Sequence, residues 1–574
     1  MKLRLISRKE FEVLLLRSRS QVVIVLISLS FGLWFITPQN VWPASTEWLR
    51  YGDMEFAQYM WEYFRRTSIL QWPIAEVGSF GEGWGTIFPS TGGIVLLGLP
   101  FKVMSPLLPE SFQYVGLWTL ANFGLQGYFA ERVFFRLGLQ EFERILGAVS
   151  ILIAPIFIFR IGMTHLDLSA HWLILASFAI YLKESKPRAF NKLLLITVLA
   201  LMINIYLFVI VFMISLAAFV KQYFAQNHLI RRHCTLIQQV LTLLTVSVLV
   251  WWLIGYYTFA GSARGVGFFR INALAFLNHR YLPSASFSQS LDNVPFLTGR
   301  TFFAYEGEGF GYLGLVGILG IAAILATLPK WWTRRNWLLF APLTGISAFL
   351  LFVALSDRIA LARREIQLPI PQLLIDARQV FRVANRFSWV AYYLLLVLGW
   401  FAVCYISRRT RLSIVALPLI LSFGIFDQSV GMTSSRSIIL NERRQLTLQS
   451  AEWAVIGKST TKMYLVPTFD VQTDANENPP SVEEWMTNSR WSDLIAFGAE
   501  HQLVTNFAYV GRPVTKQVES ANSQLSEMLE QGRIPRDSIL FFALESDWLA
   551  ARKGVQPGDI SKQLDGYFII VTNA

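Results

Sequence analysis

The chain has 574 residues, of which 54% are hydrophobic and 15% are charged. A soluble protein of ordinary composition is about 45–50% apolar and about 25% charged, so the composition excludes a soluble globular protein and indicates a multi-pass membrane protein. The net charge is +12, but the basic residues fall in short clusters between apolar runs. That pattern is typical of cytoplasmic loops and predicts no nucleic-acid partner.

The N-terminal segment is basic and leads into an apolar run at about residues 20–37. The run has the features of a signal anchor and lacks a small-residue cleavage site. We therefore expect it to be retained as the first membrane span, with the N-terminus in the cytoplasm.

The other spans follow from the basic clusters, which we expect on the cytoplasmic side. A span at Gly92 to Leu108 would put the cluster from Arg132 to Arg144 outside, so we expect an interfacial or re-entrant helix there. The long apolar stretch from Leu193 to Tyr223 is divided by an outer turn at residues 204–206. At about 17–25 residues per span, the sequence predicts eleven spans and an outer C-terminus. They lie at about residues 20–37, 112–131, 145–161, 168–183, 191–204, 206–221, 236–258, 309–328, 337–356, 388–407 and 412–428.

Two carboxylates, Asp53 and Glu55, lie in the first outer loop, at about residues 38–111. Charged side chains at a membrane surface are costly unless they do chemistry or bind a ligand. Partial burial raises the pKa of a carboxyl group toward the working range of a general base, so both are candidate catalytic residues. The alternative is that Asp53 only caps the helix that follows it, and the spacing supports the two interpretations equally.

A second group of polar residues, His165, Asp167 and His171, lies in and beside a short outer turn. Ionisable side chains at the end of a membrane helix usually face a cavity, so we interpret these as substrate or cavity residues. Two imidazoles with remote carboxylates lack the tight ligand pattern of a zinc site. The prediction therefore contains no metal ligand.

Arginines form a third group in the outer loops at about residues 259–308 and 357–387. Three of them are spaced i, i+4 and i+8 along one face of a helix, and guanidinium groups suit phosphate oxygens. Their position opposite the positive-inside loops favours a phosphate site over snorkelling to lipid head groups. The candidate phosphate-binding residues are Arg378, Arg382 and Arg386, joined by Arg264 and Arg270.

Glycines and aromatic residues surround Glu308 and Tyr312, just before a predicted span. Such a segment could line a sugar site by stacking and hydrogen bonding. The alternative is that the glycines only let helices approach one another.

The tail, residues 429–574, has more charge and shorter apolar runs than the rest of the chain. Strand-sized runs at residues 462–466 and 566–571 and a helical pattern at 518–531 predict a small soluble α/β domain. Cys234 and Cys404 do not suggest a disulfide framework. No Walker loop, nucleophile elbow or Rossmann fingerprint occurs in the sequence, which makes nucleotide-driven chemistry on the cytoplasmic side unexpected.

These motifs resemble the GT-C class of integral-membrane glycosyltransferases, and more closely a bacterial family of that class long labelled as of unknown function. The resemblance rests on Gly52-Asp53, on segments at residues 100–114 and 170–175, on Glu308 to Gly314, and on Phe381 to Phe387. It implies a GT-C-like transmembrane catalytic domain at residues 1–428 and a periplasmic α/β domain at 429–574, in the cytoplasmic (inner) membrane. Tyr206 stands in a turn where the family commonly has His-Pro-Tyr.

The resemblance implies that a sugar passes, with inversion, from a polyprenyl-phosphate donor to a glycan or glycolipid acceptor on the outer face. Asp53 would be the base, with Glu55 as a less certain partner, and Arg382 and Arg386 would bind the lipid phosphate. His165 and Asp167 stand where the class has its second acidic motif. No cofactor is required, and a divalent metal such as Mg²⁺ or Mn²⁺ stays open. The alternatives are a lipid-linked sugar flippase or transporter, a polysaccharide polymerase or ligase, and a non-catalytic scaffold.

Overall fold

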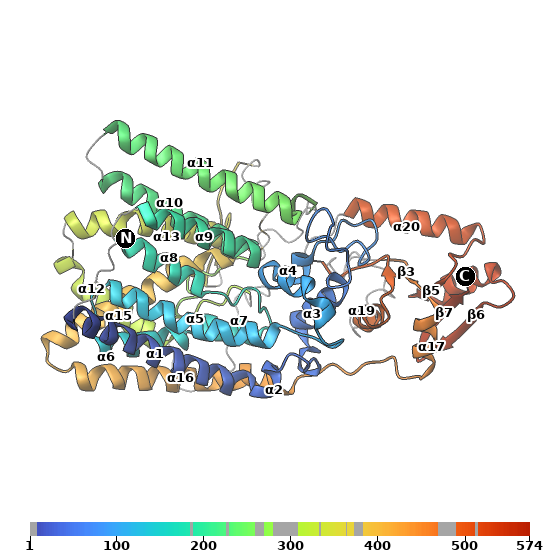
Figure 1. Cartoon of the computed structure of the whole chain (residues 1–574), viewed down its shortest axis with the longest axis horizontal. Coiled ribbons are helices and arrows are strands. Elements are labelled where there is room, and N and C mark those ends of the chain that lie inside the picture. Colours follow the sequence, from blue (N-terminus) through green and yellow to red (C-terminus); the bar gives the residue numbers. More distant parts are fainter. Residues whose placement is uncertain are drawn as a thin grey trace. The chain divides into compact units, whose positions relative to one another are not determined.

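The structure is a computed structural model, and it describes residues 8–183, 187–225, 229–258, 269–278, 308–331, 334–362, 364–371, 381, 383–468, 490–510 and 515–573. The chain forms two compact units (Figure 1). The helical unit comprises Met1–Trp48, Ser111–Ser247 and Gly265–Glu442. The mixed unit comprises Leu49–Glu110, Val248–Arg264 and Arg443–Ala574.

Each of the eleven predicted apolar segments contains a helix. The helices are α1 (Arg8–Ile36), α5 (Val115–Arg136), α6 (Glu141–Leu152), α7 (Pro155–Gly162), α8 (Trp172–Leu182), α9 (Pro187–Ile203), α10 (Ile205–Ala225), α11 (Leu229–Ile254), α12 (Gly314–Trp331), α13 (Arg334–Leu355), α15 (Trp389–Arg409) and α16 (Ser413–Asn441). The unit also contains a short helix, α2 (Pro38–Val41), a 3-10 helix, η6 (Ala384–Ser388), and a hairpin of β1 (Arg358–Leu361) and β2 (Arg364–Gln367).

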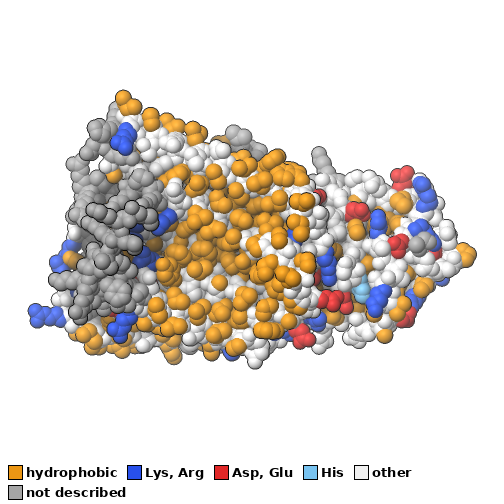
Figure 2. Space-filling model, viewed as in Figure 1, with side chains coloured by type: hydrophobic (Ala, Val, Ile, Leu, Met, Phe, Trp, Pro, Cys, Tyr) orange, Lys and Arg blue, Asp and Glu red, His pale blue; other side chains and the backbone are white. Residues whose placement is uncertain are grey.

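Within the described residues, six helical stretches are long and apolar enough to cross a membrane. They are Arg19–Ile36, Glu141–Gly162, Ile205–Ala225, Ile230–Ile254, Ala384–Arg409 and Ser413–Asn441. Apolar side chains such as Leu241, Phe349 and Ile414 are exposed on these and neighbouring helices, and Figure 2 shows apolar side chains spread over one face of the helical unit. The helices are compatible with the predicted multi-pass membrane protein, while the count of eleven spans and their orientation stay predictions.

Several helix ends differ from the predicted segments, as at α1, which begins at Arg8 instead of about residue 20, and two of the differences have a clear physical cause. The stretch at residues 145–161 is interrupted, because α6 ends at Leu152 and Pro155, which has no backbone N–H to donate, starts α7. The last helix, α16, continues past residue 428 to Asn441. Its polar residue Asp427 accepts hydrogen bonds from the Tyr312 hydroxyl and the Leu315 backbone N–H, so polar composition does not end the helix there.

A close approach of two backbones fixes part of the helical unit. Gly320 on α12 faces Gly399 on α15, and a Cβ atom built on either glycine would lie 2.8 Å from the other's Cα. Small residues at such crossings let helices pack through their backbones.

The mixed unit contains a five-stranded sheet with the order β4-β3-β5-β7-β6. The strands are β3 (Lys462–Val466), β4 (Val504–Thr505), β5 (Ser538–Phe542), β6 (Ile560–Leu564) and β7 (Tyr567–Thr572). Strand β3 pairs in parallel with β4 and β5, whereas β7 pairs antiparallel with β5 and β6. The predicted strands at 462–466 and 566–571 are thereby confirmed.

Helices cover both faces of this sheet: α17 (Glu452–Ser459), α19 (Arg490–His501), α20 (Thr515–Glu530) and α21 (Glu545–Ala551). Leu540 on β5 packs with Leu525 of α20 and Trp548 of α21. The next residue, Phe541, points to the opposite face and contacts the rings of Trp453 and Phe497. The predicted helix at 518–531 is confirmed as α20.

Most of the first outer loop, Leu49–Glu110, belongs to the mixed unit. It contains α3 (Gly52–Phe64) and α4 (Val95–Val103). The Glu82 N–H donates to the Thr505 carbonyl at 2.7 Å, and the Thr505 N–H donates to the Ser79 carbonyl at 2.9 Å. The loop thus extends the sheet at its β4 edge. Helix α4, in the segment predicted as interfacial or re-entrant, has 9 residues and is too short to span a bilayer.

Candidate functional site

Asp53 is the second residue of α3, whose N-cap residue is Tyr51. The alternative interpretation of Asp53 as the N-cap is therefore wrong. Its side chain is partly exposed, and the Tyr509 hydroxyl donates a hydrogen bond of 3.3 Å to Asp53 Oδ1. The Tyr509 ring packs against Phe56 and Trp491, with centroids 4.3 and 5.5 Å away. The carboxylate is thus oriented by a residue of the C-terminal segment.

Glu55 has a different environment, because it is buried in an ion-pair network. Arg444 Nη2 lies 2.7 Å from Glu55 Oε1, and the Tyr59 hydroxyl donates to the same oxygen at 2.8 Å. Arg444 also pairs with the buried carboxylate of Asp493. Burial, together with the charge of Glu55, raises the pKa of Tyr59 above its usual range, so Tyr59 stays protonated as a donor. The geometry leaves Asp53 more accessible than Glu55.

Sequence reasoning missed Arg444, Asp493 and Tyr509. All three belong to the C-terminal segment, which carried no motif pointing to the first outer loop. The one available signal was the pair Arg443 and Arg444, which follows the C-cap residue Glu442 of α16, since a charge beside a long apolar helix commonly has a partner.

In the helical unit, Glu308 lies at the centre of a cluster of positively charged and imidazole side chains. Arg160, in the last turn of α7, is fully buried. Its Nη1 atom lies 2.7 Å from Glu308 Oε2, and its Nη2 atom donates to the Glu308 backbone oxygen at 2.6 Å. Arg386 Nη2 lies 3.5 Å from Oε2, and His165 Nε2 lies 3.7 Å from Oε1. We call Arg160, His165, Glu308 and Arg386 the anion cluster.

The charges of this cluster keep Glu308 ionised. Burial alone would raise the pKa of its carboxyl group. The positive charge of Arg160, helped by His165 and Arg386, outweighs burial and holds the pKa below its usual range. The glutamate is therefore a permanent anion at any physiological pH.

A polar wall adjoins the anion cluster. Asn204, in the turn between α9 and α10, donates to Asp167 Oδ2 at 2.6 Å and accepts from the Tyr206 N–H at 2.8 Å. The Tyr206 hydroxyl accepts from the Val383 N–H at 3.0 Å, and the Arg386 guanidinium lies 4.6 Å from the Tyr206 ring centroid. The predicted helix break at residue 204 is confirmed.

The predicted residues His165, Asp167, Tyr206, Glu308 and Arg386 thus come together from four separate segments of the chain. All of these segments are helix ends or the turns beside them.

Two other predicted residues lie in the core beside this cluster. His171 is fully buried, with Nδ1 2.8 Å from the Tyr393 hydroxyl and its ring 4.3 Å from that of Trp389. Tyr312 is buried and donates to Asp427 Oδ2 at 3.1 Å. Both side chains have structural partners in the helical core.

The other predicted arginines are only partly described. Arg270 lies 2.6 Å from Glu365 Oε2 on β2, so its guanidinium is already ion-paired. Arg264, Arg378 and Arg382 lie outside the residues that the structure describes.

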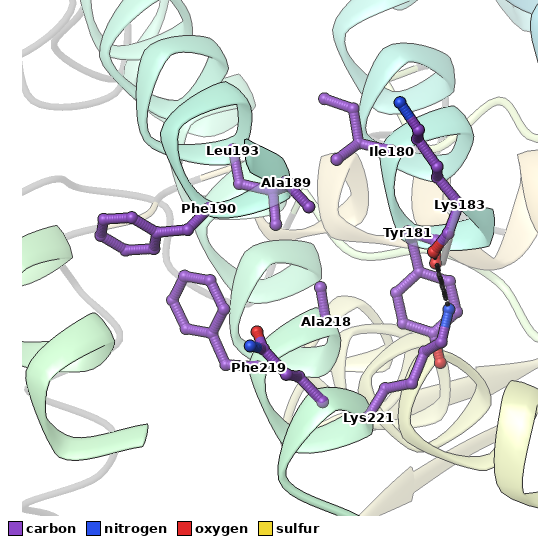
Figure 3. A pocket seen from close by; sticks show the side chains of 10 residues that line it. Ile180, Tyr181, Lys183, Ala189, Phe190, Leu193, Ala218, Phe219 and Lys221 are labelled. Atoms are coloured by element: carbon purple, nitrogen blue, oxygen red, sulfur yellow. Dashed lines mark hydrogen bonds between the residues drawn. The ribbon is translucent and has the colours of Figure 1, made fainter. Parts of the chain in front are cut away.

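A pocket elsewhere in the helical unit lies among the ends of α8 and α10 and the start of α9 (Figure 3). Lys221 donates to the Tyr181 carbonyl there and lies 3.4 Å from the Lys183 carbonyl. It thereby satisfies carbonyl groups at the C-terminus of α8, a structural role. The pocket is lined by none of the predicted site residues.

Among the described residues, no group of three His, Cys, Asp or Glu side chains is arranged to hold a metal ion. A family model described as a domain of unknown function, DUF6311, matches residues 25–429. The model of the DUF6311 C-terminal domain matches residues 452–572. A search of curated proteins found no match.

Proposed function

The chain belongs to the DUF6311 family, whose description assigns no function, and we propose that it is a membrane glycosyltransferase. In this proposal a sugar moves from a polyprenyl-phosphate donor to a cell-envelope glycan or lipid acceptor on the outer face of the cytoplasmic membrane. The resemblance to the GT-C class suggests the reaction type, and the contacts of the described residues support the roles proposed for them.

The observation that carries the proposal is the anion cluster. Arg160 and His165, at the end of α7 and in the turn after it, and Arg386, just before α15, all approach the Glu308 carboxylate at the ends of apolar helices. Guanidinium groups are preferred binders of phosphate oxygens. A lipid carrier would present its phosphate at the ends of helices, close to the level of the head groups.

In the proposed reaction, one bond forms and one bond breaks. The acceptor hydroxyl oxygen attacks the anomeric carbon from the face opposite the phosphate, and the bond from that carbon to the phosphate oxygen breaks, which inverts the configuration. Arg160 and Arg386 stabilise the negative charge that grows on the departing lipid phosphate. The resemblance to the GT-C class gives the role of general base to Asp53, which takes the proton of the acceptor hydroxyl. Within its own unit this carboxylate is partly exposed and is oriented by Tyr509.

The main rival is a lipid-linked sugar transporter. Transporter sites usually lie near the middle of the bilayer, between broken helices. The anion cluster instead lies in the last turn of α7, the turn after it and the segments that precede α12 and α15, and the adjoining polar wall includes the turn between α9 and α10. This placement at helix ends favours surface chemistry over passage through the bundle.

The test measures transfer of label from a panel of radiolabelled polyprenyl-phosphate sugars to an acceptor extract, by purified protein in lipid. We expect Asp53→Asn to lower the rate by about 10²–10⁴-fold, the usual contribution of a general base. Asp547→Asn is the matched control, because Asp547 is also a first-turn aspartate, on α21, and should leave the rate unchanged. Parallel assays with EDTA test for a required metal.

Each result has a consequence for the proposal. Full activity of Asp53→Asn would remove the base assignment. No turnover across the panel by the wild-type protein would argue for the transporter.

A further inference from the structure

The anion cluster offers more donors than Glu308 uses. Arg160 makes short contacts to Glu308, but Arg386 stays 3.5 Å from its nearer carboxylate oxygen. The Nε atoms of Arg160 and Arg386 are buried and have no hydrogen-bond partner among the described residues.

Asn385, the neighbour of Arg386 in the sequence, is also buried, at 2% exposure. Both of its polar atoms lack partners within the described part of the chain. Buried polar groups in folded proteins are nearly always hydrogen-bonded. Among the described residues, the two guanidinium groups of the cluster thus have N–H donors that the two oxygens of Glu308 do not engage, whereas a tetrahedral phosphate presents more acceptor oxygens.

We propose that Glu308 is a specificity-determining residue of this site. Without ligand, the Glu308 carboxylate occupies the position of the donor's phosphate group, and the phosphate binds by displacing this carboxylate. The inference rests on the proposed function and adds a requirement for entry: the incoming group must be an anion.

The requirement follows from charge. Arg160 is fully buried and paired with Glu308, and a buried charge left without a partner is strongly unfavourable. A lipid phosphodiester carries one negative charge, as the glutamate does, so the exchange leaves Arg160 paired throughout. A neutral lipid or free sugar would have to leave it unpaired.

The test is a binding experiment that needs no turnover. Purified protein in detergent is titrated with farnesyl phosphate, with farnesol and with inorganic phosphate. Removing the competing carboxylate by Glu308→Gln should tighten farnesyl phosphate binding by about tenfold or more, because the competent state is then populated without ligand. Farnesol should bind to the Glu308→Gln variant no more tightly than to the wild-type protein. Inorganic phosphate binding as tightly as farnesyl phosphate would overturn a site for lipid phosphate.

The matched control is Glu131→Gln. Glu131 is also a buried carboxylate of the helical unit, paired with an arginine, Arg144, at 2.9 Å. The Glu131→Gln substitution should lower the stability of the protein in a similar way without changing its affinity for farnesyl phosphate. Equal or weaker binding by Glu308→Gln than by the wild type would show that Glu308 supports the site instead of competing for it.

A second measurement uses the wild-type protein, in case the variant does not fold. Carbodiimide coupling of an amine to Glu308, read by mass spectrometry, should increase when farnesyl phosphate binds, because the carboxylate is released. Unchanged or decreased coupling would overturn the inference. Label transfer by the wild-type protein together with that result would leave the glycosyltransferase proposal standing.

Discussion

Glu62, on α3, has a carboxyl group whose pKa is affected more by burial than by its charged neighbours. Its side chain is 15% exposed, and Arg65 and Arg66 approach it only to 3.8 and 3.7 Å. Those arginines donate instead to the backbone oxygens of Glu110 and Ala499, each at 2.8 Å. Burial raises the pKa of Glu62 from 4.5 to about 7.

This shift predicts a pH-dependent stability. The folded protein binds the Glu62 proton more tightly than the unfolded chain, so this contribution is fully present below pH 4.5 and is lost as the pH rises through about 7. At about 1.4 kcal/mol per pH unit, the loss is about 3 kcal/mol. Glu62→Gln should therefore raise the thermal midpoint in detergent at pH 8 and not at pH 4.

An exposed glutamate of the same unit provides the control. Glu530→Gln, at the end of α20, should leave the pH dependence of the midpoint unchanged. A midpoint difference between Glu62→Gln and wild type that is the same at pH 4 and pH 8 would count against a raised pKa.

At the element scale, the crossing of α12 and α15 depends on two glycines. A Cβ atom at Gly399 would lie 2.8 Å from the Cα atom of Gly320, a distance that requires the helices to separate. We expect Gly399→Ala to destabilise the protein by about 1–3 kcal/mol, as overpacking does. The measurement is the thermal midpoint in detergent.

Gly345 on α13 is the comparison, since a Cβ atom there meets nothing within 4 Å. Gly345→Ala should keep or raise the midpoint, because alanine favours helix more than glycine does by about 1 kcal/mol. Equal effects of the two substitutions would show that the close approach does not matter.

Apolar runs and charge clusters were sufficient to locate the helices, because each lipid-exposed helix needs a long apolar surface. They did not place the ends. Pro155 divides a run that hydropathy treats as continuous, and α16 passes residue 428 because Asp427 has partners on α12 and just before it. Ends of elements depend on such local and tertiary contacts, which hydropathy does not report.

The site was predicted unevenly for the same reason. Asp167, Tyr206, Glu308 and Arg386 were found one by one, because each is a polar residue beside an apolar segment. Their common cluster, and the role of Arg160 within it, depend on how the helices pack. The contact of Tyr509 with Asp53 could not be predicted from the sequence, because only the tertiary fold brings the two residues together.

At the scale of the whole molecule, the mixed unit joins parts of the chain far apart in sequence. Arg444 contributes most directly, because it pairs with Glu55 from the first outer loop and Asp493 from the tail. Breaking a buried ion pair by removing one partner usually costs about 3–5 kcal/mol. Arg444→Met should therefore lower the thermal midpoint and increase hydrogen exchange in α3 and α19.

Variants of the same ion-pair network distinguish a structural role for Glu55 from a catalytic one. Suppose that Glu55 only pairs with Arg444. Adding Glu55→Gln and Asp493→Asn to Arg444→Met then removes the two carboxylate charges that Arg444→Met leaves unpaired. The thermal midpoint and label transfer should both recover in part. Glu55→Gln alone should then retain transfer, since Asp53 stays in place. Loss of transfer by Glu55→Gln with an unchanged midpoint would instead place Glu55 in the chemistry. The buried ion pair would then have to open during turnover, because Arg444 and Tyr59 both bind the carboxylate.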